Sequence, residues 1–77
     1  MATFSEESLK KRINEIKEMK TKDLKSLLTA MKLPKSRKGV SNKLVLRTIL
    51  LDDWLKEFDL DHYDISRDYH ELYVSLF

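Results

Sequence analysis

One short segment of the chain combines several groups able to bind an anion. Lys35, Arg37 and Lys38 lie just before Gly39, the only glycine of the chain, and glycine readily adopts a positive φ. Ser41 follows, and we expect it to cap a helix whose N-terminus offers free N–H groups to an anion. Cationic side chains, free amides and a helix N-terminus together predict a phosphate-binding loop.

Further cations on both sides of this loop extend the candidate site. Lys43 and Arg47 are four residues apart and would share one face of the following helix, while Lys20 and Lys22 lie at the start of the preceding one. A solvated basic surface without a ligand is the alternative interpretation. The candidate site comprises Lys20, Lys22, Lys35, Ser36, Arg37, Lys38, Gly39, Ser41, Lys43 and Arg47.

The charges of the chain are divided between its two parts. Residues 8–47 hold thirteen lysines and arginines against three acids, whereas residues 48–77 hold two against eight. The net charge of +2 conceals this separation. A basic region of this kind indicates a surface for a polyanion.

Other kinds of site find little support in the sequence. The chain has no cysteine, so it can form neither a disulfide nor a thiolate zinc site. Asp59, Asp61 and Asp64 are spaced as in a calcium loop, but the glycine and the bidentate glutamate of such a loop are missing. No serine lies in a nucleophile motif. We therefore expect no catalysis, no metal and no cofactor.

The length and composition indicate one small all-α domain over residues 1–77. With 36% charged residues, the chain has no apolar stretch near the roughly 20 residues of a membrane span, so we expect no membrane partner. Pro34 bars a helix, which makes residues 33–40 an extended connection. Residues 59–65 are predicted to be a second linker. The apolar periodicity predicts a four-helix domain with helices near residues 5–18, 21–32, 42–58 and 66–77.

Polar residues before each apolar pattern predict where the helices begin. Thr3 and Glu6 have capping-box spacing ahead of the first helix, and Thr21, like Ser41, is a plausible N-cap. Ser66 would cap the last helix. These caps would fix both ends of the basic connection.

The second helix contains an LxxLL motif formed by Leu24, Leu27 and Leu28. Such a motif can bind a transcription factor through a helix groove. All three leucines, however, lie on the face that must build the core. Core packing is the favoured interpretation, and partner binding stays open as the alternative.

The central segment, residues 19–53, resembles the SAP motif, a helix–extended loop–helix. Asp23-Leu24-Lys25 matches its acid-Leu-Lys triplet, residues 35–39 its basic loop, and Asn42-Lys43-Leu44 the start of its second helix. The loop length, the added helices at 5–18 and 66–77, and Glu71-Leu72-Tyr73 followed by Phe77 are similar to the N-terminal domain of the protein inhibitor of activated STAT (PIAS) family. The chain departs from that family at Pro34, which replaces a glycine.

The resemblance implies a monomeric module that binds A/T-rich, scaffold-attachment-type duplex DNA through phosphates and groove shape. It also implies the N-terminal targeting domain of a nuclear SUMO E3 ligase that regulates transcription, whose ligase domain is absent from these residues. A different class remains open: a protein-interaction module that binds transcription factors through the LxxLL helix or the acidic C-terminal surface. Steep salt dependence would distinguish DNA binding from that alternative.

Overall fold

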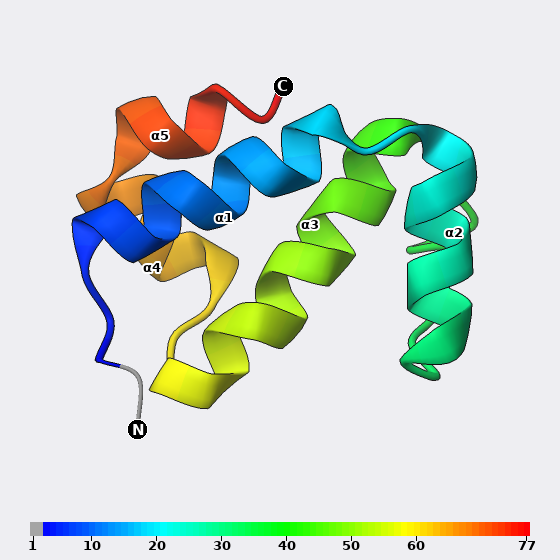
Figure 1. The fold of residues 1–77 in the computed structure, drawn as a ribbon, viewed down its shortest axis with the longest axis horizontal. Coiled ribbons are helices and arrows are strands. Elements are labelled where there is room, and N and C mark those ends of the chain that lie inside the picture. Colours follow the sequence, from blue (N-terminus) through cyan, green and yellow to red (C-terminus); the bar gives the residue numbers. More distant parts are fainter. Residues whose placement is uncertain (1–2) are drawn as a thin grey trace.

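Helix α3 (Lys43–Leu55) crosses the middle of the molecule, and the other helices pack around it (Figure 1). The computed structural model describes residues 3–77, and within them all regular secondary structure is helical apart from one isolated bridge between Arg37 and Val40. The predicted all-α class is confirmed. The remaining elements are α1 (Glu6–Glu18), α2 (Thr21–Ala30), the 3-10 turn η1 (Lys56–Phe58), α4 (His62–Asp68) and α5 (His70–Val74).

The hydrophobic core forms where the apolar stripes of the helices meet α3. Helix α3 is apolar around most of its circumference because α1, α2 and α4 all pack against it. Burial of this surface is the main force that stabilises so short a chain. The core consists of Leu9, Ile13, Ile16, Leu24, Leu28, Leu46, Ile49, Leu50, Leu51, Leu55, Ile65 and Leu76.

The first three helices begin close to the predicted positions, but none has the predicted cap. Helices α1 and α3 are capped by other side chains, and α2 has no side-chain cap. Ser5 caps α1 in a capping box with Ser8, so the predicted pair of Thr3 and Glu6 is wrong. Helix α2 begins at Thr21 itself, so the predicted Thr21 cap is wrong, and the N-cap residue, Lys20, makes no side-chain hydrogen bond. Asn42, not Ser41, caps α3, because its Oδ1 accepts from the Val45 amide at 2.9 Å.

The C-terminal third differs most from the prediction. Residues 59–65 are not a linker, since Asp61 caps α4 and Asp64 completes its capping box, and Ser66 lies inside that helix. The predicted last helix is broken at Tyr69, whose φ of −130° and ψ of 48° separate α4 from α5. Two short helices therefore occupy the place of one.

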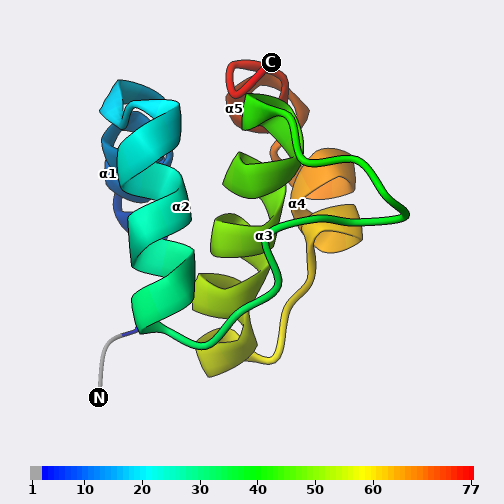
Figure 2. The same cartoon turned by 90° about the vertical axis from the view of Figure 1, so that its right-hand side faces the viewer.

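Helix α2 ends in a Schellman motif that directs the chain into the basic connection. The Lys32 amide donates to the Thr29 carbonyl at 3.1 Å, and the Leu33 amide donates to the Leu28 carbonyl at 2.8 Å. Lys32 has a φ of 58°, a position that helices usually give to glycine. Pro34 then prevents the helix from resuming. The connection crosses beside α3 and reaches out past α4 before it returns to the start of α3 (Figure 2).

Candidate functional site

The predicted phosphate-binding loop turns back on itself at a two-residue tip. The Arg37 amide donates to the Val40 carbonyl at 2.8 Å, and the Val40 amide donates to the Arg37 carbonyl at 3.0 Å. Lys38 and Gly39 form the tip with φ values of 52° and 78°, which is typical of a type I′ turn. The prediction that Gly39 takes a positive φ is confirmed. Within residues 3–77 the amides of Lys38 and Gly39 have no acceptor, so they are free to bind an anion.

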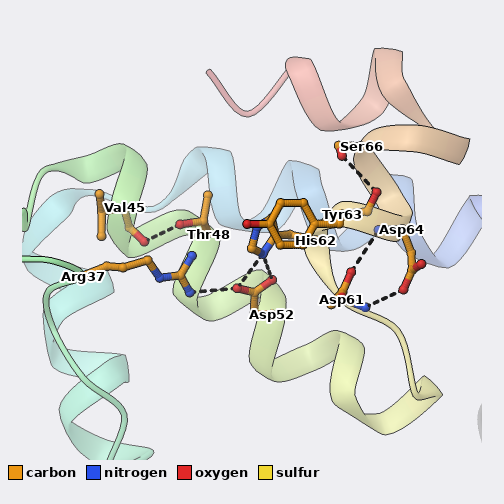
Figure 3. Close-up of polar contacts among 9 residues, drawn as sticks. All are labelled: Arg37, Val45, Thr48, Asp52, Asp61, His62, Tyr63, Asp64 and Ser66. Carbon is orange, nitrogen blue, oxygen red and sulfur yellow. Dashed lines mark hydrogen bonds and ion pairs between the residues drawn. The ribbon is translucent and has the colours of Figure 1, made fainter.

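An aspartate of α3 holds this loop against α4. One Asp52 carboxylate oxygen accepts from Arg37 Nη2 at 2.8 Å, and His62 Nδ1 lies 2.9 Å and 3.0 Å from the two oxygens (Figure 3). An ionised carboxylate can only accept, so His62 Nδ1 carries the proton. Asp52 therefore joins the loop, α3 and α4 at one point.

This arrangement divides the loop cations into two groups. Arg37 is paired, and its side chain is 40% exposed against 18% for Asp52. Lys35 and Lys38 are exposed, as is Lys43 at the start of α3, and none of the three forms an ion pair with another residue in the described part of the chain. Ser36, Gly39 and Ser41 are also exposed. The lysines are thus the charges most available to a ligand.

Arg47 lies apart from the other candidate residues and serves the fold. Its Nη1 donates to the Leu76 carbonyl at 2.7 Å and its Nη2 to the Lys17 carbonyl at 3.0 Å. The guanidinium therefore links α3 to the end of α1 and to the C-terminal turn. Because both ends of its guanidinium are occupied by these carbonyls, we leave Arg47 out of the proposed interface.

Lys20 and Lys22 lie at the start of α2, not at the loop tip. Both are exposed, and α2 and α3 begin at the same end of the molecule (Figures 1 and 2). This end also carries Lys43. The structure therefore places the candidate cations in two areas, the beginning of the helix pair and the loop beside α4.

The LxxLL motif is part of the core. Leu24 and Leu28 have no exposed surface, and Leu27 is partly buried against the same cluster. Packing of α2 against α3 uses this face. A partner could reach the two buried leucines only if α2 separated from α3.

Two aromatic residues beside the loop were not among the predicted site residues. His62 and Tyr63 begin α4, in the segment predicted to be an acidic linker, so nothing in the sequence placed them near the basic loop. In the structure they line an open groove together with Arg37, Lys38, Val40 and Val45. Tyr63 is 71% exposed, which is unusual for a large aromatic side chain.

Tyr73 lies beside His62, and its hydroxyl has a raised pKa. Burial, together with the nearby Asp52 carboxylate, raises the pKa of the Tyr73 hydroxyl above its ordinary value of 10.0. The Tyr73 ring stacks on His62, with centroids 6.5 Å apart and an interplanar angle of 18°.

The surroundings of the site add two observations. In residues 3–77 no helix is both long and apolar enough to cross a membrane, and no group of three or more histidine, aspartate or glutamate side chains is placed to hold a metal ion. No family model, curated protein or solved structure matches the chain. The arrangement that remains is a small all-α domain with a lysine-rich, tightly turned loop.

Proposed function

We propose that this chain is a DNA-binding module that contacts duplex DNA mainly through phosphates and groove shape. The observation that carries the proposal is the loop tip, where the amides of Lys38 and Gly39 are free and the loop lysines, Lys35 and Lys38, are exposed and unpaired in the described part of the chain. Lysines and backbone amides are common phosphate ligands in protein–DNA interfaces. The thirteen-to-three excess of cations over residues 8–47 supplies the long-range attraction.

The resemblance to the SAP motif supports the same function and makes it more specific. On that basis we propose a preference for A/T-rich, scaffold-attachment-type duplexes and a place in the nucleus. We also propose that the chain is the targeting domain of a PIAS-type SUMO E3 ligase. These finer assignments depend on the matched segments at residues 23–25, 35–39 and 42–44.

The rival function, binding a transcription factor through the LxxLL helix, is less favoured. Leu24 and Leu28 are fully buried, and exposing either would cost the core about 1.5–3 kcal/mol of hydrophobic stabilisation. Partner binding through the acidic C-terminal surface remains the second candidate, since eight acids lie in residues 48–77.

A charge-matched pair of variants tests the proposal. Lys35 and Lys38 would be replaced together by Ala, and the control would replace Lys10 and Lys11, two exposed lysines of α1. Affinity for A/T-rich and G/C-rich duplexes would be measured by fluorescence anisotropy over a range of salt concentrations. If each loop lysine contacts one phosphate, the log–log salt slope should fall by roughly 1.8 in the loop variant.

The Lys10 and Lys11 variant should bind DNA somewhat more weakly but keep the parent's log–log salt slope, because it removes the same charge at a place away from the loop. Exposed substitutions of this kind usually change stability by less than about 0.5 kcal/mol, and circular dichroism would confirm that both variants are folded. Equal slopes in the parent and in the folded loop variant would remove the loop from DNA binding.

A further inference from the structure

The groove between the loop tip and α4 contains exposed apolar surface, which phosphate binding alone would not use. It has a volume of about 530 Å³ and is lined by Arg37, Lys38, Val40, Val45, His62 and Tyr63. This volume is within the roughly 300–1,000 Å³ of ordinary ligand pockets. Val40 and Tyr63 are 45% and 71% exposed, so apolar surface is open to solvent beside the cations.

Tyr63 is held in position from below. Its ring lies on His62, with centroids 4.1 Å apart and an interplanar angle of 38°. Asp52 holds His62 through Nδ1 (Figure 3). The Tyr73 ring also stacks on the imidazole. Because its support is fixed, the exposed ring would lose little conformational entropy when a ligand packs on it.

A flat apolar ring next to a cation suits a nucleotide, whose base is flat and apolar on its faces and whose phosphate is anionic. In an intact duplex the base faces are already stacked on one another, so Tyr63 would have no base face to contact. An unpaired base offers such a face, and stacking on an aromatic side chain strengthens binding whatever the base.

We propose that this groove binds one unpaired nucleotide of a DNA strand, with the base on Tyr63 and the phosphate at Lys38. The inference rests on the proposed DNA-binding function and extends it to bulged or frayed duplexes. An apolar residue of an acidic peptide is the other occupant that the groove chemistry allows. The nucleotide is favoured because the groove joins the loop whose free amides and Lys35 suit phosphate.

Two fluorescent A/T-rich duplexes would test the inference, identical except that one carries a single unpaired nucleotide. We expect the parent to bind the bulged duplex at least about fivefold more tightly, the lower end of the effect of stacking one base. Tyr63→Ala should bind the two duplexes equally, whereas Tyr63→Phe, which keeps the ring, should retain the preference. Tyr63 is mostly exposed, so both variants should fold.

A further variant separates this inference from the proposed function. Lys43 lies outside the groove, so Lys43→Ala should weaken binding to both duplexes while the ratio of the two affinities stays the same. Equal affinity of the parent for the two duplexes, or a preference that persists in Tyr63→Ala, would overturn the inference and leave DNA binding in place. Failure of the parent to bind either duplex at low salt would overturn both proposals.

Discussion

Neutralising Asp52 should lower the stability of the domain and, at the same time, raise its affinity for DNA. The Asp52 carboxylate accepts from Arg37 at 2.8 Å and lies 2.9 Å from His62 Nδ1. Asp52→Asn removes the negative charge but retains the size of the side chain. Arg37 would then be released from its partner and become available to phosphate.

The magnitude follows from the exposure of the pair. With 40% of the Arg37 side chain and 18% of the Asp52 side chain exposed, the solvent screens the ion pair, and its loss should cost about 0.5–1 kcal/mol. For a domain of this size that corresponds to a fall in Tm of roughly 2–8 °C. If Arg37 gains one phosphate contact, the log–log salt slope of DNA binding should steepen by about 0.9.

Asp53→Asn provides the matched control, because Asp53 is the next residue of α3 and makes no ion pair in the described part of the chain. Both variants raise the net charge by one, so general attraction to DNA increases equally. Thermal unfolding and anisotropy titrations at several salt concentrations would measure the difference between them. Equal Tm values and equal slopes for the two variants would refute the role assigned to Asp52.

Two further predictions concern the fold. Leu28→Ala should lower the free energy of unfolding by about 2–5 kcal/mol because the side chain is fully buried, and a melting curve like that of the parent would contradict this. The Asp64 amide that donates to Asp61 lowers the pKa of Asp61 below 3.8. The resulting stabilisation is complete above that pH and is lost as the pH falls through the lowered pKa. Acid titrations should therefore show less destabilisation in Asp61→Asn than in the parent.

Local patterns in the sequence were sufficient to predict α1, α2 and α3. The stripe of Leu9, Ile13 and Ile16 and the leucines of α2 repeat with helical spacing, and a proline lies four residues after the end of α2. Each of these signals is contained within a few residues of the element that it specifies. The all-α class and the positive φ of Gly39 could therefore be predicted without tertiary information.

Features that depend on contacts between distant segments could not be predicted in this way. Arg37 and Asp52 are fifteen residues apart, and Arg47 reaches a carbonyl twenty-nine residues away. The acidic segment before Ile65 was predicted to be a linker for two reasons. Helix α4 is short, and its capping residue, Asp61, is one of several aspartates in the segment, so it does not stand out as a cap. Its single buried residue, Ile65, gives too little periodicity to indicate a helix.

The different roles of arginine and lysine in this fold indicate how it would recognise DNA. All four arginines have partners within the chain. Arg12 pairs with Glu15 and Arg37 with Asp52. Arg47 donates to the carbonyls of Leu76 and Lys17, and Arg67 pairs with Asp64 and Asp68.

By contrast, all eleven lysines are exposed and none forms an ion pair with another described residue. Arginine is the side chain best suited to bidentate contacts with guanine, whereas lysine presents a compact point charge. The free charges of this surface can therefore read the position of phosphates but have little means of reading base edges. Any preference for A/T-rich duplexes must then come from the width and deformability of the minor groove, which follow the sequence without a base contact.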